Sequence, residues 1–198
     1  MVSRIDDLLE DIARLEREVE REFDGARARW RYRIEEGRVR FERGVHVAHA
    51  RLKQSIPRYL RESSIPNLLT APLIGSLIVP IALLDVWLSL YQAVCFRVYG
   101  IALVRRSRYI VIDRQHLAYL NGIEKVNCVF CGYANGVFAY VREIAGRTEQ
   151  YWCPIRHAKR LPAPHVHYRR FVDYGDAAGY HRRLLFLRKE LRGGQRGN

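Results

Sequence analysis

Four residues near the middle of the chain have the types and the spacing of a metal site. Cys128 and Cys131 form a Cys-x2-Cys pair, and Cys153 is followed four residues later by His157. Three thiolates and one imidazole fill the tetrahedron that Zn²⁺ prefers in structural sites, and they leave no position for a reacting water. The spacing therefore predicts a structural zinc site formed by Cys128, Cys131, Cys153 and His157.

The local sequence is compatible with such a site. Gly132 would permit the left-handed backbone that closes a knuckle after the second cysteine. Pro154 suits the first position of a helix that would present Cys153 and His157 on one face. We therefore expect a small α+β zinc-knuckle module. The same four residues could instead hold a [2Fe–2S] cluster, which would make the chain a membrane-bound electron-transfer protein.

Two elements are expected to frame the metal site. Arg108–Asp113 has the β-branched run of a short buried strand. Apolar residues recur with helical spacing between Asn135 and Gln150, which predicts a helix between the two halves of the site. Polar residues on this helix, among them Glu143 and Arg147, are expected to support the metal ligands or to form a binding face.

An apolar stretch precedes this module. Residues 66–96 contain a single charged residue, Asp85, and are interrupted by Pro72 and Pro80. The two flanks carry equal numbers of basic residues, which favours a membrane-embedded, proline-broken helical hairpin with both ends in the cytoplasm. A single span and a buried helix pair of a soluble protein are the alternatives. We expect Asp85 to lie at the turn of the hairpin or near an interface rather than in a functional site.

The amino-terminal part has a different pattern. Apolar residues recur three and four positions apart in a narrow seam, which is typical of a coiled coil or a bundle helix; these are Ile5, Leu8, Ile12, Leu15 and Val19. We expect one or two long helices over the first 60 or so residues. Their apolar seam would pair with a protein partner or with a second copy of the chain.

The charge of the chain is strongly asymmetric. The net charge is +13, and residues 105–198 carry 18 Lys and Arg against 7 Asp and Glu. Such a balance favours anionic partners, and an anionic membrane surface is the first of these. Nucleic acid is a second, less favoured partner, and it would be contacted by six basic residues: Arg169, Arg170, Arg182, Arg183, Arg188 and Lys189. No glycine-rich phosphate loop, serine nucleophile motif or paired carboxylates occur, so the sequence favours a non-enzymatic role.

One stretch resembles a known family. YIVIDRQHLAYLNGIEKVNCVFCGYANGVFAYVREIAGRTEQYWCPIRHAKR, together with Tyr174-Gly-Asp176, is similar to an uncharacterised family of bacterial membrane-associated proteins. The resemblance extends over roughly residues 65–180 and leaves out the amino-terminal helices. It implies a bacterial source and no particular activity.

These patterns predict a mainly α protein with four parts. They are a coiled-coil-like arm (1–62), a membrane-associated segment (63–104), a Cys3His metal-binding module (105–180), and a basic helix with a disordered tail (181–198). The expected function is that of a zinc-stabilised adaptor or assembly scaffold. It would be located at the bacterial inner membrane, with its soluble parts facing the cytoplasm.

Overall fold

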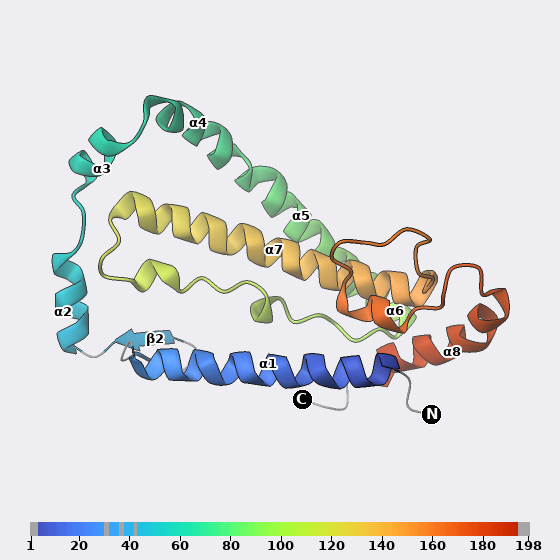
Figure 1. The fold of residues 1–198 in the computed structure, drawn as a ribbon. Coiled ribbons are helices and arrows are strands. Elements are labelled where there is room, and N and C mark those ends of the chain that lie inside the picture. The colour runs from blue at the N-terminus through green and yellow to red at the C-terminus, as the bar shows by residue number, and fades with distance from the viewer. Residues whose placement is uncertain (1–3, 30–31, 36–37, 42, 194–198) are drawn as a thin grey trace. The chain divides into compact units, whose positions relative to one another are not determined.

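The computed structural model describes residues 4–29, 32–35, 38–41 and 43–193 (Figure 1). These residues are mainly helical, which confirms the predicted class. The chain divides into two compact units. The first comprises Met1–Glu62 and Asp113–Val126, and the second comprises Ser63–Ile112 and Asn127–Asn198. The predicted disordered tail falls partly on residues 194–198, which lie outside the described residues.

The first unit contains a helical arm that is interrupted by a β-hairpin. Its elements are α1 (Arg4–Arg29), β1 (Tyr32–Glu35), β2 (Arg38–Phe41), α2 (Arg43–Arg51) and α3 (Ile56–Glu62). The prediction of a long helix is confirmed for α1, which has 26 residues, and is wrong for the β-hairpin and the two short helices that follow. Apolar residues alternate with polar ones on both sides of Gly37, and this period of two suits strands rather than a helix. The hairpin pairs Tyr32 with Phe41 and Ile34 with Val39.

The predicted seam of the arm lies on α1. Leu15 and Val19 are exposed on this helix, and Phe23 lies exposed one turn further on. The side chains of Ile5 and Leu8 lie outside the described part of the chain. Pairing of the arm with a partner or a second copy stays a prediction.

The apolar segment forms one helix rather than a hairpin. α4 (Ile65–Ser76), α5 (Ile78–Tyr91), a π-helical turn (Gln92–Phe96) and α6 (Arg97–Tyr99) follow one another directly, and together they make a continuous helix of 35 residues. The prediction of a broken hairpin is wrong, because Pro80 lies in the first turn of α5, where a missing N–H breaks no bond within that helix. Pro72 lies inside α4 without ending it.

The remaining elements of the chain are two 3-10 turns, one long helix and a carboxy-terminal pair. They are the turns Arg106–Arg108 and Arg114–His116, α7 (Gly122–Trp152), the 3-10 helix Val166–Arg170 and α8 (Ala177–Gly193). The described residues between 105 and 180 contain no β-strand, only an isolated bridge between Ile155 and Val172. The predicted α+β character of this module and the strand at Arg108–Asp113 are therefore wrong.

α7 begins before Asn135, the predicted start, because two reciprocal hydrogen bonds cap its first turn. The backbone N–H of Asn121 donates to Glu124 Oε2 at 2.8 Å, and the backbone N–H of Glu124 donates to Asn121 Oδ1 at 3.0 Å. This reciprocal arrangement satisfies two amide groups that would otherwise be orphaned at a helix start. Helix α7 therefore extends through Cys128 and Cys131 as well as through the predicted range.

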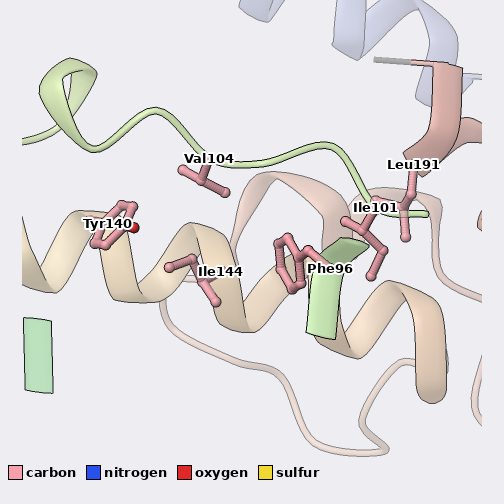
Figure 2. Packing of buried hydrophobic residues seen from close by; sticks show 6 residues of the cluster. All are labelled: Phe96, Ile101, Val104, Tyr140, Ile144 and Leu191. Atoms are coloured by element: carbon pink, nitrogen blue, oxygen red, sulfur yellow. The ribbon is translucent and has the colours of Figure 1, made fainter. Parts of the chain in front are cut away.

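The core of the second unit lies between α7, the π-helical turn, the chain that follows α6, and α8. Six buried residues form its main cluster (Figure 2): Phe96, Ile101, Val104, Tyr140, Ile144 and Leu191. A smaller cluster of Ile81, Ala134 and Val137 lies further back along α5 and α7. Contacts advance in the same direction along both helices, so α5 and α7 run parallel. The chain after α6 returns beside them.

The return segment approaches α7 most closely at Gly136. A Cβ atom at this position would lie 2.7 Å from Ile110 Cα and 2.8 Å from Tyr109 O, which are backbone atoms. Gly75 in α4 offers a matched comparison, because a Cβ atom there would meet nothing within 4 Å.

We expect Gly136→Ala to lower the free energy of unfolding of the second unit by about 1–3 kcal/mol, because the return segment must shift away from α7. Gly75→Ala should be neutral or slightly stabilising, since alanine is favoured over glycine in a helix by about 1 kcal/mol. Chemical denaturation of both variants in detergent measures the difference. Equal effects of the two substitutions would contradict the close packing at Gly136.

Candidate functional site: polar groups behind an apolar helix

The structure does not bring the four predicted metal ligands together. Cys128 and Cys131 lie on α7, and Cys153 directly follows its last residue. With 22 residues from Cys131 to Cys153 and a rise of about 1.5 Å per residue, the helix separates them by about 33 Å. His157 lies in the loop after α7, where its backbone N–H donates to the Tyr168 hydroxyl.

Two further details differ from a knuckle. Gly132 is buried within α7, and the described glycines with positive φ are Gly100 and Gly175. Among the described residues, no group of three or more His, Cys, Asp or Glu side chains is arranged to hold a metal ion. Zinc and the [2Fe–2S] cluster stay predictions that the observed placement of the ligands does not favour.

The carboxy-terminal half of the long apolar helix buries two polar side chains. Asp85 and Gln92 are only 5% and 7% exposed. They continue a stripe that begins at Ile81 and ends at Phe96, also buried residues. The opposite face is apolar and exposed, with Leu83, Val86, Trp87 and Leu90. This distribution is the reverse of that on the surface helix of a water-soluble domain.

Asp85 is held by two residues from different segments. Arg106 in the return segment forms a two-point contact with the carboxylate, with Nη2 2.6 Å from Oδ2 and Nε 3.0 Å from Oδ1. The Tyr133 hydroxyl on α7 donates to Oδ2 at 2.9 Å. The expectation that Asp85 lies at a hairpin turn is wrong, since it lies within α5. The ion pair joins α5, the return segment and α7.

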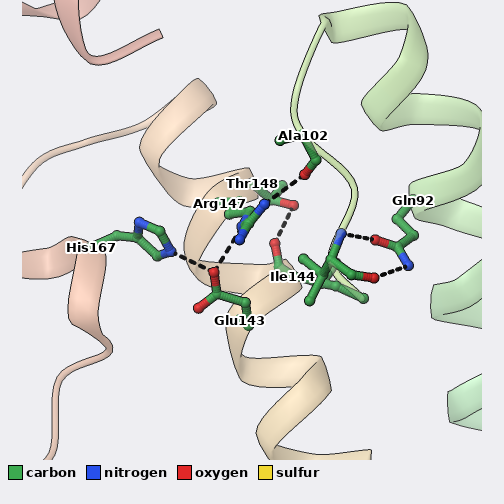
Figure 3. A network of polar contacts seen from close by, with 8 residues as sticks. Gln92, Ala102, Glu143, Ile144, Arg147, Thr148 and His167 are labelled. Atoms are coloured by element: carbon green, nitrogen blue, oxygen red, sulfur yellow. Dashed lines mark hydrogen bonds and ion pairs between the residues drawn. The ribbon is translucent and has the colours of Figure 1, made fainter. Parts of the chain in front are cut away.

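Gln92 also binds the return segment, and it does so through a neutral amide group. The backbone N–H of Val104 donates to Gln92 Oε1 at 2.9 Å, and Gln92 Nε2 donates to Val104 O at 3.2 Å. The side-chain amide thus supplies the two hydrogen bonds that a neighbouring strand would otherwise make. Figure 3 shows both of these hydrogen bonds as dashed lines. Gln92 Nε2 also donates to the hydroxyl oxygen of Tyr140, which lies 3.3 Å from the Ser89 hydroxyl.

A second polar cluster lies on another face of α7. Glu143 Oε1 accepts hydrogen bonds from Arg147 Nε at 2.7 Å and from His167 Nε2 at 3.0 Å. Arg147 also donates to Ala102 O at 2.7 Å (Figure 3). Burial alone would raise the pKa of Glu143, but the hydrogen bonds and charges of His167 and Arg147 outweigh burial and lower that pKa to about 2. The carboxylate holds the loop after α7 through His167, and it orients Arg147, which holds the return segment.

A neighbouring contact is possible only because residue 146 is glycine. His165 Nε2 lies 2.8 Å from Glu149 Oε2. The rings of His165 and His167 lie against α7 so closely that a Cβ atom at Gly146 would be 2.8 Å from His165 Nδ1. Glu143, Gly146 and Glu149 therefore form a seat for the loop on one face of α7.

The six basic residues predicted to contact nucleic acid are largely engaged within the chain. Arg170 contacts Glu190, Arg182 donates to Ala178 O, Arg183 to Arg170 O, and Arg188 to Tyr151 O. Arg169 and Lys189 are exposed. Binding of nucleic acid stays a prediction with no arrangement on this surface that favours it.

No family model, no curated protein and no solved structure matches the chain. The resemblance of residues 65–180 to a bacterial family stays a prediction.

The partners of the buried polar groups Asp85 and Glu143 were not predicted from the sequence. An isolated Asp85 in an uncharged segment requires a cation, but nothing in the local sequence identifies Arg106 among the several arginines that follow. The pair Glu143 and Arg147 has helical i, i+4 spacing and could have been found. The contact with His167 depends on how the loop folds back, for which the sequence carries no signal.

The ion pair of Asp85 predicts an asymmetric response to substitution. The Arg106 side chain is 47% exposed, so it can regain water when its partner is removed, whereas Asp85 cannot. We expect Arg106→Met to lower the free energy of unfolding by about 3 kcal/mol, and Asp85→Asn to lower it by about 1 kcal/mol. Denaturant titration of both variants measures the order, and a larger effect of Asp85→Asn would contradict the asymmetry.

The low pKa of Glu143 predicts a dependence of stability on pH. Because its folded pKa is about 2, below the ordinary value of 4.5, the carboxylate stabilises the fold above about pH 4.5. That contribution is lost as the pH falls from 4.5 towards 2. The difference in thermal midpoint between the wild type and Glu143→Gln should therefore be large at pH 6 and small at pH 2.5. A difference that does not change with pH would contradict the role given to this carboxylate.

Proposed function

We propose that this chain is a non-enzymatic adaptor at the cytoplasmic face of the bacterial inner membrane. Its apolar helix would embed in the lipid, and its arm and basic module would recruit partners. The observation that supports the proposal is the distribution of side chains on Ile65–Tyr99. Its two buried polar side chains, Asp85 and Gln92, face the chain's own return segment and α7, while large apolar side chains from Leu68 to Leu90 face outward, as they do on helices in contact with lipid.

The length and exposure of the helix agree with this proposal. It is the one helix in the described part of the chain that is long and apolar enough to cross a membrane. Only 11% of its most apolar 18-residue window is buried, whereas the core helix of a soluble protein would be mostly covered. Residues 65–80 are exposed throughout, and residues 63–84 carry no charge. The 20 residues from Ile65 to Leu84 would extend about 30 Å and offer lipid an uncharged surface of that length.

The return segment favours embedding from one side over a simple crossing. Residues up to Glu62 and residues 113–126 belong to the same compact unit, so the chain before the helix and the chain after the return meet again. The return itself is irregular apart from two 3-10 turns and carries charged residues, and such backbone does not cross lipid unprotected. Both flanks of the helix would then lie on the cytoplasmic side.

Aromatic residues gather at the carboxy-terminal end of the helix. Tyr99 stacks on Tyr151 with ring centroids 5.0 Å apart, and Trp152 packs edge-on against both. The guanidinium of Arg188 lies 4.8 Å from the centre of the Tyr151 ring. Tyrosine, tryptophan and arginine are typical of the headgroup level, so this cluster would lie at the membrane surface.

The adaptor role is proposed from the arm. α1 exposes Leu15, Val19 and Phe23, and the first 24 residues carry nine acidic side chains against four basic ones. Such a face fits a partner helix that is apolar and basic. The zinc of the original prediction is not required for this function.

Membrane association is tested with two exposed leucines in the middle of the apolar helix. Leu69 and Leu73 are 75% and 72% exposed, so replacing them with aspartate should leave the fold intact. Each aspartate should oppose insertion by roughly 3 kcal/mol. We expect Leu69→Asp/Leu73→Asp to abolish flotation with phosphatidylglycerol-containing vesicles, whereas the wild type floats.

A matched control places two aspartates elsewhere. Val47 and Leu52 in the first unit are also exposed, and Val47→Asp/Leu52→Asp adds the same charge. This control should float as the wild type does. A wild-type chain that stays with the soluble fraction, or a control as defective as the helix variant, would overturn the proposal.

A further inference from the structure

The loop that follows α7 forms an open, concave surface with a basic lining. A cavity of about 490 Å³ lies between residues 156 and 168, and its lining includes Arg156, His157, Lys159, Arg160 and Tyr168. No acidic residue contributes to this lining. The whole stretch from Tyr151 to Val172 contains five Lys and Arg and no Asp or Glu.

The walls of this cavity are fixed by contacts outside it. Arg142 on α7 donates through Nη2 to the carbonyls of Ala163 and Pro164, at 2.7 Å and 2.6 Å. Two prolines, Pro162 and Pro164, restrict the backbone of the same wall. The rings of His165 and His167, which follow these prolines in the sequence, pack against α7 at Gly146. These contacts attach the loop to α7 and restrain its backbone.

Other lining residues of the cavity are held by further contacts. The backbone N–H of His157 donates to the Tyr168 hydroxyl at 2.6 Å, and the two rings stack with centroids 6.1 Å apart. Arg156 Nη1 lies 2.8 Å from Asp173 Oδ1, so this arginine is partly neutralised and serves the loop. Two other basic side chains at the rim of the cavity form no ion pair with a described residue of the chain.

The two basic side chains at the rim belong to Lys159 and Arg160. Both side chains are exposed, and no Asp or Glu among the described residues lies within ion-pair distance of either one. Two adjacent cations beside a preformed cavity without acidic lining repel each other until an anion binds. Ammonium and guanidinium groups together suit a group with several charged oxygens, and phosphate is the common biological example.

We propose that the cavity between Arg156 and Tyr168 binds a phosphate-bearing ligand. Lys159 and Arg160 supply the charge, and the stacked pair His157 and Tyr168 shapes the wall. The phosphate belongs either to a lipid headgroup or to a small soluble molecule. This site does not depend on insertion of the apolar helix, because it lies in the loop after α7.

The test uses the full-length protein purified in a neutral detergent, titrated calorimetrically with inorganic phosphate and with pyrophosphate. Flotation with vesicles of phosphatidylcholine, with and without phosphatidylglycerol, forms a second arm. Whichever of these probes the wild type binds, we expect Lys159→Ala/Arg160→Ala to weaken its binding by roughly tenfold or more. Each lost charged hydrogen bond removes a substantial share of the affinity. Tyr168→Phe should weaken it as well, although it changes no charge.

The matched control is Arg182→Ala/Lys189→Ala on α8, which removes the same charge outside the cavity. It should keep at least half of the wild-type affinity. Binding of phosphate or pyrophosphate in detergent would identify a soluble ligand, and a cavity-dependent preference for phosphatidylglycerol vesicles alone would identify a headgroup. No binding in either arm, or an equal loss in the α8 control, would overturn the proposal. Because the detergent arm needs no membrane, a failure of helix insertion would leave its result unaffected.

Discussion

A buried carboxylate on an apolar helix must have a cation beside it, and the second unit is arranged around this requirement. Asp85 finds that cation in Arg106 of the return segment and a hydroxyl donor in Tyr133 of α7. An unpaired charge in this position would cost several kcal/mol. The return segment must therefore run back beside α5 rather than continue away from it. One ion pair thus determines the path of a segment that has almost no regular secondary structure.

Gln92 extends the same constraint two turns further along the helix. A segment without regular structure carries backbone amides and carbonyls that need partners when they are buried. Gln92 supplies both partners for Val104, and Arg147 accounts for the carbonyl of Ala102. Side chains on the two flanking helices thus do for the return segment what a neighbouring strand does in a sheet. No strand forms in the β-branched run after Arg108, where the backbone N–H groups of Tyr109 and Ile110 donate to Arg106 O within a turn.

The sequence predicted the elements whose signals are local and missed those that depend on distant partners. The mainly helical class follows from apolar periodicity, and the helix within 135–150 was found from the same pattern. The extension of α7 back to Gly122 was missed, because Cys128 and Cys131 at i, i+3 fit a turn and a helix equally well. Asn121 and Glu124 decide between the two, and their spacing is a capping signal that the sequence does contain. The β-hairpin was missed because helices were expected over all of the first 60 or so residues, although Ile34 and Phe41 belong to an alternation that fits strands.

The length of α7 also explains how one helix can serve two separate surfaces. Towards α5 it presents Tyr133, Gly136 and Tyr140, which receive the apolar helix and the return segment. On other positions it presents Arg142, Glu143 and Gly146, which hold the loop that forms the basic cavity. A knuckle at Cys128 would end the helix and separate these two sets of contacts. Because α7 is continuous, the contacts with α5 and the contacts with the loop belong to one helix. The glycines at 136 and 146 lie ten residues apart on α7. The return segment approaches the helix closely at the first of them, and the loop approaches it closely at the second. Both surfaces therefore depend on the same uninterrupted backbone.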